Sequence, residues 1–199
     1  MSSMYLDSDI YEDGGDFSDV IITGNFAVST IDPAACTGSY IVTGANNGGG
    51  AITGTFNIVP LSYTLRRLGC HIMQGLGNTG FRLSVYDRTG LAIARTALWN
   101  IGPLASDLGE KFFSVAEVWD GSAWVPGTEA TLTGGQGYYF AISAPQVSAA
   151  ARFMGRDAGT TFGPKPWISW TADNLADQTP GQLPAGYETS VRHLIIGAA

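Results

Sequence analysis

Cysteine and histidine are scarce in this chain. Among its 199 residues, only Cys36, Cys70, His71 and His193 belong to these two types. Two cysteines in a chain of this length do not make a disulfide framework, and we expect both to be reduced. Neither histidine lies in H-E-x-x-H, in H-x-H or in a Cys/His cluster with metal-ligand spacing, so we expect no metal centre and no cofactor.

Long apolar runs and clustered basic residues are also missing. No window approaches the roughly 20 apolar residues of a membrane span, and the N-terminus lacks the basic start and apolar run of a secretory signal. We therefore expect a protein that is made in a cytoplasm and has no membrane partner. The basic residues are scattered singly apart from Arg66-Arg67, a pattern too sparse to predict nucleic-acid binding.

Sequence motifs of known catalytic sites are also missing. The chain has no G-x-S-x-G elbow, and no spacing favours paired carboxylates for glycoside cleavage. A twelve-residue calcium loop starting at Asp9 fails because Tyr11 and Val20 occupy ligand positions. We predict a non-enzymatic protein. The acids that could still converge in a glycan-degrading enzyme are Glu110, Glu117, Asp120 and Asp157.

The glycines at 75–80 match the dinucleotide fingerprint G-x-G-x-x-G letter by letter. That fingerprint needs a helix after its glycines, so that the helix N-terminus faces the pyrophosphate. Residues 81–86 instead alternate apolar and polar side chains, which predicts a strand. We interpret the glycines as a hairpin turn.

Acidic residues are concentrated at the N-terminus. Six of the 17 acids precede residue 20 and the first basic residue is Arg66, so the rest of the chain holds 11 acids against 10 bases. Such a segment is usually a solvated arm, and the alternative is a peptide that orders on a basic partner. We predict the second role for residues 1–19. The proposed docking residues are Tyr5, Leu6, Asp7, Asp9, Ile10, Tyr11, Glu12, Asp13, Asp16 and Phe17.

The clearest strand pattern lies at residues 131–143. Its alternation puts Tyr138 and Phe140 on one face and Tyr139 and Ala141 on the other, after a Gly-rich turn. A matching run at 80–86 points its apolar residues inward and its polar residues, Arg82 and Ser84, outward. The turn at Asp87–Gly90 follows it.

Similar short runs recur along the chain and predict an all-β, jelly-roll-like β-sandwich over residues 20–199, behind an extended acidic arm. At most a short turn of helix is expected, at 105–110. Hairpins are predicted at the Asn/Gly-rich stretch 45–50 and at Asp120-Gly121. The further predicted strands are 20–30, 40–43, 51–59, 65–74, 91–99, 115–119, 124–125, 147–154, 167–171 and 190–197.

Tryptophans provide the remaining functional signal. Trp119 and Trp124 flank the turn at Asp120-Gly121, and Trp167 and Trp170 lie beside a Pro-rich loop. Exposed indole rings near loop tips are platforms for sugar faces or protein partners, whereas buried ones fill a core or a subunit interface. Both alternatives stay open, and we take Trp119 and Trp124 as candidate ligand-binding residues.

Three segments carry a family resemblance: Phe81–Leu91, Leu132–Ile142, and Leu183-Pro184 before a closing strand. In this order they resemble the jelly-roll modules at the C-termini of tailed-phage fibres and related virion appendages. In that family, the first segment is a strand that ends in an Asp-x-x-Gly turn, and the second is a strand with paired aromatics. Leu-Pro introduces the last strand.

The resemblance implies a homotrimer that mediates virion assembly or binds host-surface glycans, with a major capsid or tail protein as its partner. No collagen-like or coiled-coil stalk precedes the predicted sandwich, and the acidic arm takes its place. The chain is therefore more similar to a head decoration (cement) protein, a head fibre or a small tail-tip subunit. The alternatives are a tail-tip receptor-binding subunit and a free carbohydrate-binding module. No ligand position is carried over, because residues 101–129 exceed the family's usual spacing.

Overall fold

The structure is a computed structural model that describes residues 28–29, 38–42, 49–74, 79–101, 108–144, 151–157, 167–173, 179–183, 192–194 and 196–198. Within these ranges every regular element is a β-strand and every strand pair is antiparallel. The all-β prediction is therefore confirmed for them. The predicted acidic arm, with its docking residues and its boundary at residue 20, lies outside the described residues.

The strands follow one another with little other structure between them. In chain order they are β1 (Val28–Ser29), β2 (Gly38–Val42), β3 (Gly49–Val59), β4 (Tyr63–Leu65), β5 (Arg67–Gln74), β6 (Thr79–Asp87), β7 (Ala92–Thr96), β8 (Trp99–Ile101), β9 (Gly109–Trp119), β10 (Trp124–Pro126), β11 (Ala130–Leu132), β12 (Gln136–Ala144), β13 (Ala151–Asp157), β14 (Trp167–Asp173), β15 (Arg192–Leu194) and β16 (Ile196–Ala198).

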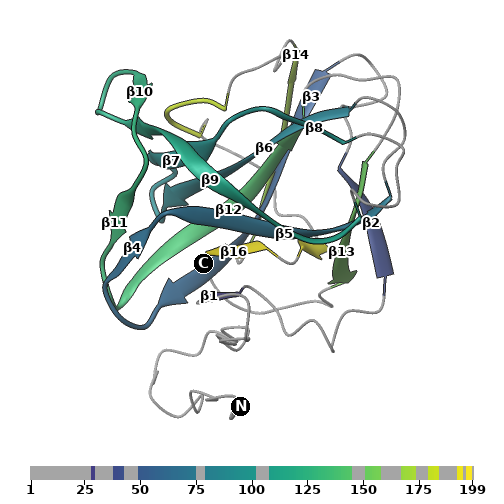
Figure 1. Ribbon diagram of the computed structural model, residues 1–199, viewed down its shortest axis with the longest axis horizontal. Helices are drawn as coiled ribbons and strands as arrows, with labels where there is room; N and C mark the ends of the chain where they lie inside the picture. Colours follow the sequence, from purple (N-terminus) through teal and green to yellow (C-terminus); the bar gives the residue numbers. More distant parts are fainter. Residues whose placement is uncertain are drawn as a thin grey trace.

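One large sheet contains nearly all of these strands. Its main path runs β1-β16-β5-β9-β7-β6-β12-β3-β14, and β11 and β4 form a separate pair. The sheet curls into a half-barrel, so that β5 faces β12 and β3 across the interior (Figure 1). β12 holds a central place, paired with β3 from Gln136 to Ala144 and with β6 from Tyr138 to Ser143.

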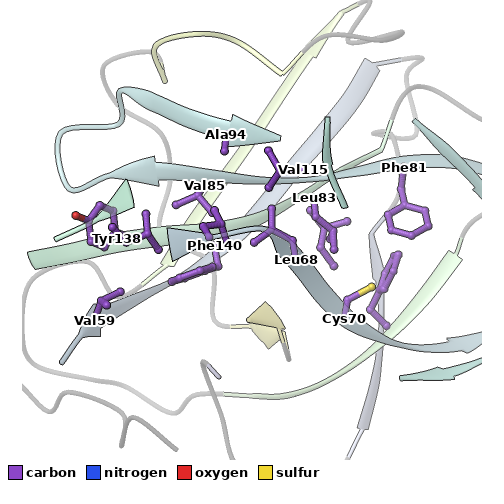
Figure 2. Packing of buried hydrophobic residues seen from close by; sticks show 14 of the residues in the cluster. Val59, Leu68, Cys70, Phe81, Leu83, Val85, Ala94, Val115, Tyr138 and Phe140 are labelled. Carbon is purple, nitrogen blue, oxygen red and sulfur yellow. The ribbon is translucent and has the colours of Figure 1, made fainter. Parts of the chain in front are cut away.

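The concave side of the sheet encloses the main core, which we call the inner cluster. Leu68 and Cys70 of β5 meet Leu83 of β6 and Phe140 of β12 there, and all four are fully buried (Figure 2). Aromatic edges add contacts, since Phe81 packs against Phe153, Phe113 and Trp99 with ring centroids 5.3 to 5.7 Å apart. The predicted alternation of residues 138–142 is confirmed, since Tyr138, Phe140 and Ile142 all lie in the inner cluster.

The convex side carries a second, smaller core, which we call the outer cluster. Its buried members are Ile52, Tyr86, Ala92, Tyr139, Ala141 and Leu183. The prediction that Arg82 and Ser84 look outward into solvent was wrong. Ser84 is fully buried and the Arg82 side chain is only 14% exposed, because residues 179–183 and two tryptophans cover this side of the sheet.

Two predicted hairpins were also wrong. β2 pairs with β13 rather than with β3 across residues 45–50. β5 and β6, which flank the glycines at 75–78, pair with other strands and not with each other. Gly and Asn allow the chain to reverse, but burial of the apolar faces decides which strands pair.

Other local predictions are confirmed. Residues 79–87 after the glycines form a strand, as the rejection of a dinucleotide site requires. The turn at Asp87–Gly90 joins β6 to β7, with Gly90 N donating to Asp87 O at 2.9 Å. By contrast, the short helical turn allowed at 105–110 is wrong for residues 108–110, because β9 begins at Gly109, and residues 105–107 lie outside the described residues. The β9–β10 hairpin across Asp120-Gly121 is present.

Candidate functional site

The hairpin of β9 and β10 presents the two candidate tryptophans. Trp119 and Trp124 are directly opposite each other across the strand pair. The turn between them is closed by Asp120, whose Oδ1 accepts hydrogen bonds from Ala123 N and Ser122 N at 2.8 Å and from Ser122 Oγ at 2.9 Å. These donors, the backbone of Ala123 first, hold the pKa of Asp120 below its usual value. The turn is thus fixed by its own side chain.

The two indoles form an edge-to-face pair. Their ring centroids are 5.4 Å apart with an interplanar angle of 70°, and both side chains are half-buried against the outer cluster. Trp124 Nε1 donates to Thr179 O at 2.9 Å, whereas Trp119 Nε1 is buried with no hydrogen-bond partner in the described part of the chain. Neither ring is completely enclosed, so surface contact by this pair stays a prediction.

A network of charged side chains, Arg95, Glu117 and Arg82, packs next to the tryptophan pair. The guanidinium carbon of Arg95 lies 4.4 Å from the Trp124 ring centroid, and Arg95 is only 6% exposed. Its Nε donates to Glu117 Oε2 at 2.7 Å and its terminal nitrogen to Thr179 Oγ1 at 3.1 Å. Arg82 also donates to Glu117 Oε2, at 3.3 Å, and to Thr96 O, at 3.0 Å. The desolvated cation therefore has a carboxylate partner, as burial of a charge requires.

The same network sets the acidity of its members. The hydrogen bond from Arg95 holds the pKa of Glu117 below its usual value, helped by the charges of Arg95 and Arg82 and opposed by partial burial. Burial raises the pKa of Tyr86 well above its usual value, and the hydroxyls of Ser84 and Thr179 offset only part of this effect. At neutral pH, Glu117 is ionised and Tyr86 is neutral.

Residues 179–183, which we call the cover segment, close the outer cluster. Gly181 O accepts from Ala92 N at 2.8 Å, and Leu183 N donates to Gly90 O at 2.9 Å. The Gln182 side chain adds a bond to Thr89 O at 2.9 Å. A Cβ on Gly181 would lie 2.1 Å from the Trp119 ring, so only glycine allows this close approach. The cover segment and the tryptophan hairpin therefore hold each other in place.

Several candidate carboxylates do not form a pair suited to glycoside cleavage. Glu110 and Glu117 are seven residues apart on β9, about 23 Å along a strand, whereas such pairs are separated by roughly 5 to 9.5 Å. Glu117 is held by Arg95 and Arg82, and Asp120 by its turn. Asp157 pairs with Arg192 through the backbone of β13 and β15.

Cys70 and His71 are consecutive residues of β5. Cys70 is a free thiol, fully buried in the inner cluster, and burial raises its pKa well above the usual range. His71 is opposite Glu110 on β5 and β9, while Cys36 lies outside the described residues. In the part of the chain that the structure describes, no three His, Cys, Asp or Glu side chains gather as metal ligands. The same part contains no helix able to cross a membrane.

Sequence reasoning found the tryptophan pair but missed its supports, Arg95, Thr179 and Gly181. Arg95 lies within a predicted strand, and its neighbours come from β10 and the cover segment. No local sequence pattern predicts these contacts, because Thr179 is 84 residues away from Arg95 along the chain.

No protein-family model, curated protein or solved structure matches this chain.

Proposed function

We propose that this chain is a non-enzymatic structural protein of a bacteriophage particle, of the head decoration or short fibre type. It attaches by its acidic N-terminal arm, residues 1–19, to a major capsid or tail protein. Its β domain, a jelly-roll-like sandwich in this proposal, is displayed outward as a homotrimer and contacts host-surface glycans.

One observation carries the proposal: the three segments that resemble phage jelly-roll modules lie together in the fold. β6 and β12, which hold the first two segments, pair over six residues. Leu183 of the third segment donates its backbone N–H to Gly90 at the turn after β6. Tyr86 and Tyr139 meet Leu183 in the outer cluster. Segments far apart in sequence therefore form one structural unit, as a shared module requires.

The arm supplies the proposed means of attachment. It combines six acids with five large apolar side chains, too few to bury a core of its own. On a basic partner surface, such a segment exchanges chain entropy for apolar contacts and charge-assisted hydrogen bonds. Attachment should weaken with salt, because exposed charges are screened over about 8 Å at physiological ionic strength.

The half-buried Trp119 and Trp124 supply the proposed glycan contact. The Trp124 N–H group donates to Thr179 O, and the Trp119 N–H group is buried. A sugar would therefore contact the exposed parts of the two rings. A rigid aromatic surface of this kind suits the apolar face of a pyranose.

A reconstitution experiment tests the attachment. Particles that lack the protein are mixed with the full chain, with a chain lacking residues 2–19, and with a chain whose six arm acids are replaced by Asn or Gln. We expect saturable, stoichiometric decoration by the full chain and little by the other two. Decoration at full occupancy by the truncated chain would place the docking surface on the β domain. Failure of the full chain to bind any particle would contradict the proposed function.

The two alternative functions predict different results in the same binding experiments with particles and host polysaccharide. A tail-tip receptor-binding subunit would decorate tails in a few copies rather than cover heads. A free carbohydrate-binding module would bind host polysaccharide but no particle. Replacing both Trp119 and Trp124 by alanine should abolish polysaccharide binding while particle decoration persists.

A further inference from the structure

An exposed basic cluster lies where β4 meets β5. It consists of Tyr63, Arg66, Arg67 and Phe112. The guanidinium carbon of Arg67 lies 5.6 Å from the Phe112 ring centroid, and Arg67 is exposed with no acidic partner in the described part of the chain. Arg66 makes one ion pair, Nε to Glu129 Oε2 at 3.0 Å, with side chains 68% and 55% exposed. Both guanidiniums keep N–H groups for another acceptor.

The charges of both arginines reach the Tyr63 hydroxyl. Burial raises the pKa of Tyr63, and the positive charges of Arg67 and Arg66 offset part of that rise. The two cations therefore lie close to a phenol and to an aromatic ring where β4 meets β5. Carboxylates and aromatic side chains are its natural ligands.

The strand register brings the start of the described chain beside this cluster. Val28 of β1 is opposite Ala198 of β16, and Ala198 is opposite Leu68 of β5. Two strand spacings therefore separate the backbones of Val28 and Leu68, about 10 Å. Because β1 and β5 run in the same direction, the chain enters β1 from the side on which Arg67 precedes Leu68.

The segment before Val28 is complementary to the cluster in charge and in chemistry. It carries the six acids and the aromatic residues Tyr5, Tyr11 and Phe17, while Arg66-Arg67 is the only adjacent pair of bases in the chain. Asp19 is nine residues before Val28, and nine extended residues span about 30 Å. The acids can therefore reach the cluster without strain.

We propose that the acidic segment Asp7–Asp19 docks in cis on the basic cluster of Arg66 and Arg67. This goes beyond the proposed function, because it gives the arm an intramolecular binding site that it occupies until a partner displaces it. Exposed ion pairs are individually weak, but a tether gives an effective concentration in the millimolar range. A partner with a denser basic surface then competes successfully.

Cleavage of the arm by a glutamate-specific protease tests this proposal on the purified full chain, with no particle present. Initial cleavage at Glu12 is followed by intact mass at low salt in wild type, in R66Q/R67Q and in R88Q. Arg88 is an exposed base in the β6–β7 turn, so R88Q is the control for a loss of charge. We expect roughly tenfold faster cleavage in R66Q/R67Q, equivalent to about 1.4 kcal/mol, and wild-type behaviour in R88Q. High salt should remove the difference.

Equal cleavage rates in wild type and R66Q/R67Q would overturn the proposal. Protection that increases with protein concentration would overturn docking in cis and place the arm on a neighbouring copy. R67Q alone, which keeps the Arg66–Glu129 pair, gives an intermediate rate and guards against misfolding of the double variant. Circular dichroism of each variant checks the fold. Because no particle takes part, this result is independent of the particle-binding test above.

Discussion

Replacing Gly181 by alanine places a methyl group where the Trp119 ring lies. The new Cβ would be 2.1 Å from Cη2 and 2.2 Å from Cζ2 of that ring, far inside van der Waals contact. Trp119 has little freedom to move, because it packs edge-to-face on Trp124 and its Nε1 is buried. Gly181 is itself fixed by the hydrogen bond from Ala92 N. Either the indole or the cover segment must shift.

The expected loss of stability follows from these contacts. Forcing one extra methyl into a packed site costs about 1–3 kcal/mol, and a shift of the indoles also strains the bond from Trp124 to Thr179. We predict a loss of about 2 kcal/mol, a roughly 30-fold change in the unfolding equilibrium constant. In a Trp119→Ala background the methyl has room, so G181A should then change stability by less than about 0.5 kcal/mol.

Urea unfolding followed by far-UV circular dichroism measures the four free energies of this cycle. Gly109→Ala is the control, because Gly109 has a positive φ of 88° but no atom within 4 Å of its Cβ position. It reports backbone strain without crowding. If G181A in the wild-type background unfolds within about 0.5 kcal/mol of wild type, the packing of the cover segment on the hairpin is refuted.

Three further predictions follow from the buried charges and the thiol. Arg95→Met should lower the free energy of unfolding by about 3 kcal/mol, since Thr179 Oγ1 loses its donor and Glu117 keeps only the longer bond from Arg82; an equal loss in the exposed control Arg88→Met would contradict this. The depressed pKa of Glu117 means that its contribution to stability is present above its unfolded pKa of about 4.3 and disappears as pH falls through its folded value. Glu117→Gln should therefore flatten the acid side of the stability profile, and an unchanged acid slope would argue against the ion pair. Cys70 should react with a thiol reagent at pH 8 only at the rate of unfolding; rapid labelling of the native chain would show that it is accessible.

The sequence predicted the strands better than their partners. Alternation correctly put Tyr138 and Phe140 on one face and Tyr139 and Ala141 on the other, because every second side chain of a strand shares one environment. It failed for Arg82 and Ser84, since polarity was taken as a sign of exposure. Their side of the sheet is covered by residues about one hundred positions later, and nothing near β6 encodes that contact.

In the candidate site, too, the local structure was predictable and the long-range contacts were not. Asp120-Gly121 has the turn chemistry that brings Trp119 and Trp124 together, so the hairpin was predictable from local residues. The cation beneath Trp124 was not, because Arg95 comes from β7. Long-range pairing and cover depend on which apolar faces must be buried together, and a single sequence does not specify this choice.

Quantitative mass spectrometry of purified phage particles tests the central claim most directly. If the chain is a virion structural protein, its peptides should copurify with particles through density gradients, in a fixed ratio to the major capsid or tail protein. Particles can also be washed in high salt and then returned to low salt with added chain. Recovery of the original ratio after this treatment would support reversible attachment. Recovery of the chain only in the soluble fraction of infected cells, with none in the particles, would contradict the account.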